Sequence, residues 1–376
     1  MINLERTPSP YLKWMLSRNP FSELSSESLE DVGKIHVWTK IDYEIFQIVN
    51  SAVKNKENVL IMVVGEFGSG KTERLKIIGL SFQEIPSIYV KIDSEDVVSV
   101  VRRIVSSLEN EMEGVPKIFK KRDRFSEKIN RATFNLDETI SIIERLTEKH
   151  RGLMLLLDEL ENILLVGSED SETFIKFLSK ILSLNRLIIA ICACTPPAWE
   201  KMRTRDEISG LKLKILHIRG VSVEEALKIV ENRIKRSRNP PGYSFGDPLY
   251  PFNEKAIRYV YNIVGGNPRA MIKTLRMILT TLSTDSKVHV IDEKVVSTIF
   301  KKEPSRPTMK LPHVTDEEAQ IIGKIIEAFK EEEFSYISVA KRLAIPPEKA
   351  YNILESLRRR NILRKHKSKY KLIVEV

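Results

Sequence analysis

A long apolar run followed by closely spaced glycines constrains the fold of this chain more than any other feature. Residues 59–64 read Val-Leu-Ile-Met-Val-Val, and residues 65–72 read Gly-Glu-Phe-Gly-Ser-Gly-Lys-Thr. The apolar run predicts a buried strand, and the glycines predict a tight turn with backbone angles that other residues avoid. A helix is expected over residues 71–82. Since the N–H groups of such a turn and the positive end of the helix point to one place, the pattern predicts a phosphate-binding loop.

The polar residues of this loop have separate expected tasks. Lys71 is expected to reach the β- and γ-phosphates of a nucleoside triphosphate, and the Thr72 hydroxyl to hold Mg²⁺. An ordinary glycine turn is the alternative interpretation, and the strand before the loop and the helix after it argue against that alternative. We therefore expect ATP and Mg²⁺ as cofactors. The expected contacts from this loop are Gly65, Gly68, Ser69, Gly70, Lys71, Thr72 and Glu73.

A second strand ends in two carboxylates. Residues 153–157 read Leu-Met-Leu-Leu-Leu and are followed by Asp158 and Glu159. Because parallel sheets bind ligands at the carboxyl ends of their strands, we expect these acids beside the phosphate loop. Asp158 would then contact Mg²⁺, and Glu159 would orient and polarise the attacking water. Two solvated acids are the alternative, but a base at this position favours hydrolysis over passive binding.

The composition excludes several classes of protein. A length of 376 residues suits two or three domains. The longest apolar runs, such as residues 187–194, are far shorter than the ~20 residues that a membrane span needs. The N-terminus lacks the basic-then-apolar pattern of a signal peptide, and Cys192 and Cys194 lie in a strand-like run where small core residues are expected. We expect a cytoplasmic protein with no membrane partner.

Strands alternate with helices in the first half of the chain and give way to helices alone after it. Further strands are expected over residues 88–92, 187–194 and 213–218. This alternation predicts an α/β P-loop NTPase fold, with a parallel sheet covered on both faces. An irregular N-terminal arm, residues 1–40, is expected to pack beside the nucleotide base.

Changes in this pattern give the expected domain boundaries. A nucleotide-binding core with its arm is expected over residues 1–220, and an all-α lid over residues 221–303. A capping box at Ser222 opens the first lid helix. Residues 304–312 are rich in proline, which blocks helix continuation, and predict a linker. A last domain is expected over residues 313–376.

The last domain predicts helices followed by a hairpin, the order of a winged helix. Residues 356–371 hold eight Lys and Arg residues and no acid, and the whole chain has a net charge of +10. Such a surface would neutralise the phosphates of double-stranded DNA. A winged helix that binds protein, or a merely solubilising face, are the alternatives. The expected DNA-contacting residues are Lys349, Asn352, Arg358, Arg359, Arg360, Arg364, Lys365, Lys367 and Lys369.

With the phosphate loop and its paired carboxylates, the chain resembles the AAA+ ATPases. Thr195 stands where that family has a polar residue, often Asn, that contacts the γ-phosphate. Arg269, in the run Gly-Gly-Asn-Pro-Arg, resembles the lid arginine that reaches back to the nucleotide. Arg203 and Arg205 lie where the family places an arginine finger for a neighbouring subunit, although solvated arginines are the alternative. The resemblance implies association with other AAA+ subunits and the catalytic residues Lys71, Asp158, Glu159, Thr195 and Arg269.

The order of core, lid and winged helix is similar to that of the archaeal origin-recognition and replication-initiator ATPases. That resemblance implies an ATP-dependent DNA-binding switch. It also implies a second DNA contact through an insertion in the core, for which the basic stretch at residues 117–124 is a candidate. The segment around Trp38 lacks the entry signature common in initiators. A signal-transduction or transposition-helper ATPase, whose winged helix contacts protein or its own core, is the alternative.

Overall fold

The computed structural model divides the chain into two compact units, residues 1–296 and 297–376. The described residues are 9–22, 36–93, 96–112, 125–132, 134–148, 150–165, 168–241, 246–302, 324–325, 329, 333–345, 347–359, 363–366 and 369–372. The basic stretch at residues 117–124 and the expected linker at residues 304–312 lie outside them.

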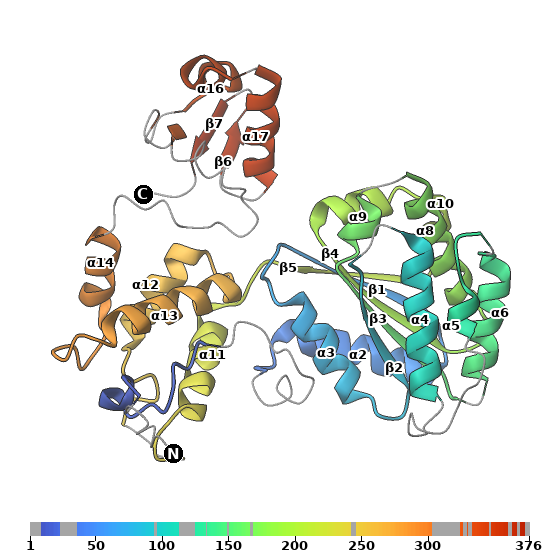
Figure 1. Cartoon of the computed structure of the whole chain (residues 1–376), viewed down its shortest axis with the longest axis horizontal. Helices are drawn as coiled ribbons and strands as arrows, with labels where there is room; N and C mark the ends of the chain where they lie inside the picture. Colours follow the sequence, from blue (N-terminus) through green and yellow to red (C-terminus); the bar gives the residue numbers. More distant parts are fainter. Residues whose placement is uncertain are drawn as a thin grey trace, which may run out of the picture. The chain divides into compact units, whose positions relative to one another are not determined.

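The first unit is built on a parallel sheet with the order β2-β3-β4-β1-β5 (Figure 1). Its strands are β1 (Val59–Gly65), β2 (Ser87–Lys91), β3 (Leu153–Asp158), β4 (Ile188–Cys194) and β5 (Leu213–Ile218). Every residue of β1, β3 and β4 is buried, because these strands are central and covered on both faces. The five expected strands and the α/β class are confirmed.

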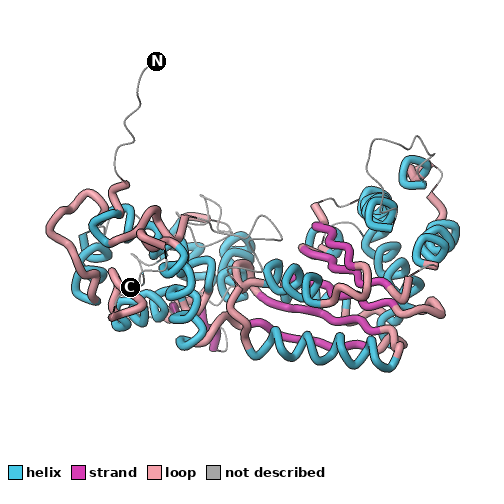
Figure 2. Tube along the Cα trace, turned by 90° about the horizontal axis from the view of Figure 1, so that it is seen from below, coloured by secondary structure: helices cyan, strands magenta, loops and turns pink. Residues whose placement is uncertain are grey.

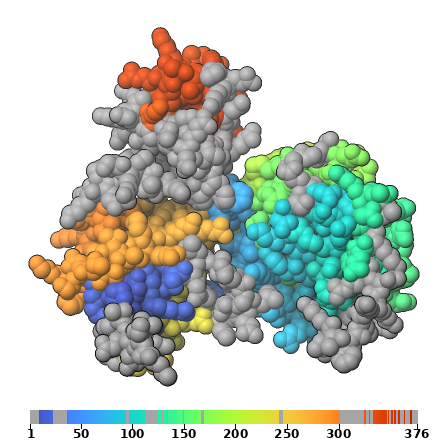
Figure 3. Space-filling model, viewed as in Figure 1, coloured from blue at the N-terminus to red at the C-terminus, as the bar shows by residue number. Residues whose placement is uncertain are grey.

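Helices cover both faces of this sheet, as Figure 2 shows. One core packs β1 against α2 (Lys40–Asn55) and α3 (Lys71–Ser81). The opposite core packs the sheet against α4 (Val97–Met112), α6 (Leu136–Thr147), α8 (Ser168–Leu182) and α9 (Pro196–Met202). Alternate residues of β1 face the two cores, with Ile61 in the first and Met62 in the second. Atoms of α4 and α6 (cyan to green) cover much of the face seen in Figure 3.

Three short helices complete the sheet region of this unit. They are α5 (Phe125–Lys128), α7 (Glu161–Leu164) and α10 (Asp206–Ser209). The helices α7, α8, α9 and α10 lie between β3 and β5 along the chain. The sequence patterns gave no bounds for helices in this region. Among the described residues, no helix is both long and apolar enough to cross a bilayer.

The remainder of the first unit is helical, as expected for residues 221–303. Its helices are α11 (Val223–Arg236), α12 (Glu254–Val264), α13 (Pro268–Leu282) and α14 (Glu293–Lys302), the last of which runs into the second unit. The predicted capping box is present, because the Ser222 hydroxyl accepts from the Glu225 N–H while the Glu225 carboxylate accepts from the Ser222 N–H. The side chains of Asn253 and Asn267 cap α12 and α13.

Part of the N-terminal arm packs on this helical region and not beside the phosphate loop. Residues 9–22 include a short 3-10 helix, η1 (Leu12–Trp14). The fully buried Trp14 donates from Nε1 to the Val288 carbonyl at 3.1 Å. Asn19 donates from Nδ2 to the Arg276 carbonyl at 3.2 Å. The expected position of the arm beside the nucleotide base stays a prediction.

The described residues of the second unit include two helices and a hairpin. The helices are α16 (Tyr336–Leu343) and α17 (Pro347–Arg359), and the antiparallel strands are β6 (Leu363–His366) and β7 (Lys369–Leu372). Val339, Leu354 and Tyr370 lie in their common core. Their order, helices followed by a hairpin, is the one that the sequence predicts for residues 313–376, of which a large part lies outside the described residues.

The packing of the sheet predicts a large difference between two isoleucines. Ile191, on β4, is fully buried, and Ile215, on edge strand β5, is 41% exposed. Ile191→Ala should lower the free energy of unfolding by about 2–4 kcal/mol, because it leaves a cavity between the helix layers. Ile215→Ala should cost less than about 1 kcal/mol. Urea unfolding followed by circular dichroism measures both, and equal losses would contradict the strand order.

Candidate functional site

Three neighbouring strands bring the predicted site residues to one edge of the sheet. In the parallel register, Val64 of β1 lies opposite Cys194 of β4, and Leu157 of β3 lies opposite Cys192. The phosphate loop, the Asp158-Glu159 pair and Thr195 follow these strand ends directly. The structure therefore brings together residues that the sequence spreads over more than a hundred positions.

The phosphate loop has the backbone that its glycines predict. Gly68 and Gly70 have φ angles of 79° and 92°, in the region that favours glycine. A Cβ on Gly68 would also lie only 2.8 Å from Oδ1 of Asn267. The buried Ser69 hydroxyl has no hydrogen-bond partner among the described residues. A buried, unpaired hydroxyl in a glycine loop is suited to a ligand with oxygen atoms.

Lys71 lies against its own loop. Its ammonium donates to the carbonyls of Gly65 at 2.7 Å and Glu66 at 3.1 Å. Burial lowers the pKa of Lys71, while the charges of Glu161 and Asp158 oppose this shift. The buried ammonium is thus held close to the place where phosphates are expected, and it can exchange two neutral carbonyl partners for charged oxygens.

Thr72 and Asp158, the two expected Mg²⁺ ligands, are in direct contact. The Thr72 hydroxyl donates to Oδ2 of Asp158 at 2.7 Å, and the Tyr89 hydroxyl donates to the same oxygen at 2.9 Å. Burial, and then the Asp158 charge, raise the pKa of Tyr89, which keeps it a hydrogen-bond donor. A hydroxyl and a carboxylate fit Mg²⁺, which prefers oxygen and keeps several ligands for water and phosphate. Among the described residues, no group of three or more His, Cys, Asp or Glu forms a full metal cage.

Glu159 is held in place by two partners. Its Oε1 forms an ion pair with Lys91 Nζ at 3.1 Å, and the Asn162 amide lies 3.5 Å from Oε2. Lys91 ends β2 and lies opposite Asp158 in the register. Glu159 also has a φ of 60°, which is unusual for a residue with a side chain. Strain of this kind occurs where the surroundings fix a residue in one orientation.

Thr195 is fixed by an acid that the sequence patterns did not single out. Its N–H donates to Oε2 of Glu161 at 3.2 Å. Thr195 is 3% exposed and Glu161 is 6% exposed. Burial raises the pKa of Glu161, while the Lys71 charge acts in the opposite direction. The loop after β4 is thus joined to the helix that follows Glu159.

Arg269 lies at the start of α13, next to the phosphate loop. Its N–H approaches the Gly68 carbonyl at 3.4 Å. The neighbouring Asn267 donates from Nδ2 to the Phe67 carbonyl at 2.9 Å. The N-terminus of α13 therefore contacts the loop through Asn267 and through the backbone of Arg269, and the expected contact of the Arg269 side chain with the nucleotide stays a prediction.

Arg203 and Arg205 each have a carboxylate partner within the chain. Arg203 pairs with Glu200 at 2.7 Å, and Arg205 pairs with Glu172 at 3.1 Å. Arg203 follows α9, and Arg205 caps α10. Their expected role as arginine fingers stays a prediction.

Seven of the nine expected DNA-contacting residues lie on α17 and the strands β6 and β7. Arg358 and Lys369 are exposed, and Lys369 Nζ lies 3.9 Å from a Glu333 oxygen. Lys349, Asn352 and Arg359 belong to α17, and Arg364 and Lys365 belong to β6. Arg360 and Lys367 lie outside the described residues.

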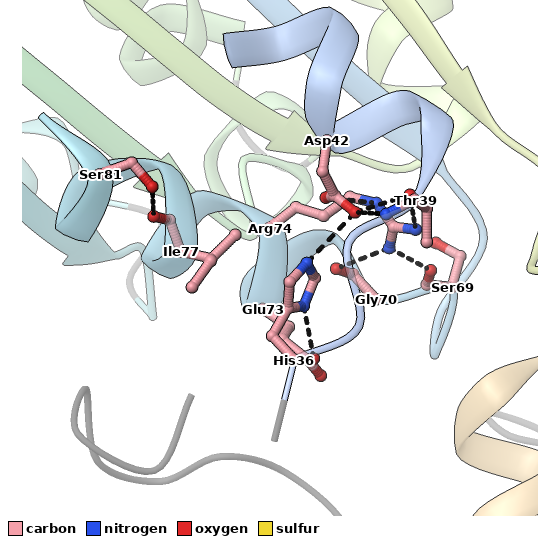
Figure 4. Close-up of polar contacts among 9 residues, drawn as sticks. All are labelled: His36, Thr39, Asp42, Ser69, Gly70, Glu73, Arg74, Ile77 and Ser81. Atoms are coloured by element: carbon pink, nitrogen blue, oxygen red, sulfur yellow. Dashed lines mark hydrogen bonds and ion pairs between the residues drawn. The ribbon is translucent and has the colours of Figure 1, made fainter. Parts of the chain in front are cut away.

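A buried cluster of charges joins the segment before α2 to the first turn of α3 (Figure 4). The Glu73 carboxylate, expected at the nucleotide, contacts Nδ1 of His36 at 2.7 Å. Nε2 of His36 lies 3.2 Å from Oδ2 of Asp42, and Nε of Arg74 lies 3.3 Å from Oδ1 of Asp42. Two cations thus alternate with two carboxylates, a pairing that burial requires. Spacing along the sequence gave no sign of this cluster.

The cluster predicts that part of the stability depends on pH. Burial acts to lower the pKa of His36, but Asp42 and Glu73 outweigh it and raise the pKa to about 9. Since the folded pKa exceeds the unfolded value of about 6.5, the stabilisation is complete below pH ~6.5 and is lost as pH rises through about 9. The free energy of unfolding should therefore fall between pH 7 and pH 10 by more in the wild type than in His36→Gln. The exposed His217→Gln serves as the control, and equal pH profiles for wild type and His36→Gln would exclude the assignment.

Comparison with known proteins agrees with this geometry. Residues 54–202 match the sequence model of a family described as an AAA domain. No curated protein sequence matches the chain. The residues matched by the family model, 54–202, include the phosphate loop, Asp158, Glu159 and Thr195.

Solved structures similar to this chain include archaeal ORC proteins. The ORC2 protein of Aeropyrum pernix, in ADPNP-ADP complexes, is 15% identical with a TM-score of 0.58, covering 94% of this chain and 93% of its own. The ORC1 protein of Aeropyrum pernix, in complex with DNA, is 13% identical with a TM-score of 0.54. The alignment covers 92% of this chain and 91% of the ORC1 chain. A Walker-type ATPase of Pyrococcus abyssi is 13% identical with a TM-score of 0.53. The alignment covers 88% of this chain and 92% of the chain of that ATPase. Residues 54–202 therefore match an AAA domain, in a chain whose fold is similar to that of the archaeal ORC proteins.

Proposed function

We propose that this chain binds and hydrolyses ATP and uses the nucleotide to switch its binding of double-stranded DNA, in the manner of a replication initiator. The observation that carries the proposal is the contact between Thr72 and Asp158 at the mouth of the phosphate loop, with Glu159 next in sequence. Nucleotide, metal and water sites would then lie within a few ångströms of one another.

Each residue of the site would have one task in hydrolysis. Thr72 and Asp158 would hold Mg²⁺, which when bound neutralises charge on the phosphate oxygens. Lys71 would leave the carbonyls of its own loop and pair with the β- and γ-phosphates. Glu159 would orient the attacking water and accept its proton. Its ion pair with Lys91 at 3.1 Å would have to open for that step, so that the carboxylate can turn toward the water.

The contact between the loop and α13 would make the nucleotide a switch. Asn267 and the Arg269 N–H bond to carbonyls of the loop, so they sense its conformation. Arg269 would reach the γ-phosphate and be released when that phosphate leaves. A ligand shifts an equilibrium only by binding one state more tightly, and the γ-phosphate is the group that differs between ATP and ADP.

The second unit would provide the DNA-binding surface, as a winged helix. The described residues of the basic run 356–371 belong to α17, β6 and β7, and Arg358 and Lys369 are exposed on these elements. Charges of one sign on a recognition helix and wing suit the phosphates of a duplex. The similarity in fold to a protein solved with DNA supports this assignment.

One observation favours the alternative, a signal-transduction or transposition-helper ATPase whose winged helix contacts protein. Ile337 on α16 is 59% exposed and Tyr351 on α17 is 42% exposed. Exposed apolar and aromatic side chains on neighbouring helices suit a protein surface. Self-association through Arg203 and Arg205 would be compatible with either function.

The role of Glu159 predicts a separation of binding from hydrolysis. Glu159→Gln should lower the rate of ATP hydrolysis by about 10²–10⁴-fold, because the amide cannot accept the proton. The affinity for ATP should change little, since the loop is untouched. Phosphate release and titration with a fluorescent ATP analogue measure the two quantities, and the exposed Glu44→Gln on α2 is the control. A normal hydrolysis rate in Glu159→Gln would rule out this general base.

The basic surface predicts salt-dependent affinity for duplex DNA. The double variant Arg358→Ala/Lys369→Ala should bind random duplex DNA more weakly than the wild type. The slope of its log affinity against log salt concentration should be shallower, by the amount that corresponds to the loss of about one to two phosphate contacts. Lys54→Ala/Lys228→Ala removes the same charge from exposed positions of the first unit and is the control. Fluorescence anisotropy at several salt concentrations gives both values. No wild-type affinity for DNA, with intact ATPase activity, would favour the protein-binding alternative.

A further inference from the structure

The side chain of Arg74 underlies the phosphate loop and approaches it from the side of α2. Arg74 lies in the first turn of α3 and is 4% exposed. Its Nη1 donates to the Ser69 carbonyl at 3.2 Å and to the Gly70 carbonyl at 3.2 Å (Figure 4). One guanidinium thus holds two consecutive carbonyls of the loop.

Holding these carbonyls fixes the direction of the N–H groups that follow them. In a planar trans peptide, the C=O of one residue and the N–H of the next point to opposite sides. The Ser69 carbonyl therefore sets the direction of the Gly70 N–H, and the Gly70 carbonyl sets that of the Lys71 N–H. Among the described residues, no group accepts a hydrogen bond from these two N–H groups. They are unpaired donors at a helix N-terminus, where an anion binds.

The fit between Arg74 and the loop is tight. A Cβ on Gly70 would lie 2.6 Å from Nη1 of Arg74. The last glycine of the loop is therefore required by its φ of 92° and also by the guanidinium beneath it. Any side chain at position 70 would push Arg74 away from the carbonyls.

Arg74 is itself held by the start of α2. Its Nη2 donates to the Thr39 hydroxyl at 3.3 Å, and its Nε lies 3.3 Å from Oδ1 of Asp42. Asp42 is fully buried and accepts from the Thr39 N–H at 2.7 Å and from its hydroxyl at 2.6 Å. A guanidinium fixed at three points has little freedom, so the carbonyls that it holds are fixed as well.

We propose that Arg74 is a positioning residue for phosphate binding, which keeps the N–H groups of Gly70 and Lys71 directed at the phosphates before the nucleotide arrives. Arg74 acts through the loop and does not contact the nucleotide itself. The fork of a guanidinium is needed because one compact ammonium cannot replace its fixed, planar set of donors. This inference rests on the proposed nucleotide binding and is independent of DNA binding.

The test compares two variants, one that keeps the Asp42 carboxylate beside a cation and one that removes both charges. Arg74→Lys keeps a positive charge beside Asp42 but loses the fork. Arg74→Met/Asp42→Asn removes both charges, so that no carboxylate of this pair is left buried and unpaired. Both variants should unfold cooperatively near the wild-type midpoint. Their dissociation constants for ADP should rise by about 10- to 100-fold, the scale at which small displacements of a positioned group are felt.

Inorganic pyrophosphate distinguishes positioning of the loop from other structural roles. If Arg74 positions the loop, the affinities for ADP and for pyrophosphate should fall by similar factors, measured by calorimetry and by competition. A loss for ADP alone would assign Arg74 to the base side and overturn the proposal. So would a folded variant that binds both ligands within about threefold of the wild type. Wild-type protein that binds neither ligand would instead refute nucleotide binding.

Discussion

The parallel hydrogen-bonded register of β1, β3 and β4 is the constraint on which the rest of the site depends. These strands are buried along their whole length, so a shift of one residue would turn core side chains to the wrong face. That register places Gly65, Asp158 and Thr195 at one edge of the sheet. The chemistry of the site is thus fixed by hydrophobic burial several residues away from it.

Charges at this edge of the sheet are paired within the chain. The Lys71 ammonium lies among carbonyls and near the buried acids Asp158 and Glu161, and Glu159 is neutralised by Lys91. Such pairs cost desolvation energy and contribute little net stability. These pairs hold the side chains in fixed orientations at the edge of the sheet.

The sequence predicted what is local and missed what depends on strand order. The apolar runs, the glycine loop and the acid pair are contiguous patterns, and the structure has the expected strands and helices there. The partners of the acids, Tyr89 and Lys91, come from β2, which lies next to β3 only once the sheet order is known. Trp14 belongs to the arm for which no fold was predicted from the sequence, and it is fully buried on the helical region, where it donates to the carbonyl of Val288, far away in the sequence.

Asn267 has two bonds that make it a pivot. Its Oδ1 caps α13 by accepting from the Ala270 N–H at 3.0 Å, while its Nδ2 holds the Phe67 carbonyl at 2.9 Å. A helix of 15 residues is about 22 Å long, so a tilt of about 10° at that pivot moves its far end by roughly 4 Å. A small displacement of one loop peptide would therefore become a larger displacement at the C-terminal end of α13. The side chain of Asn267 would transmit the effect of phosphate binding from the loop to that end of the helix.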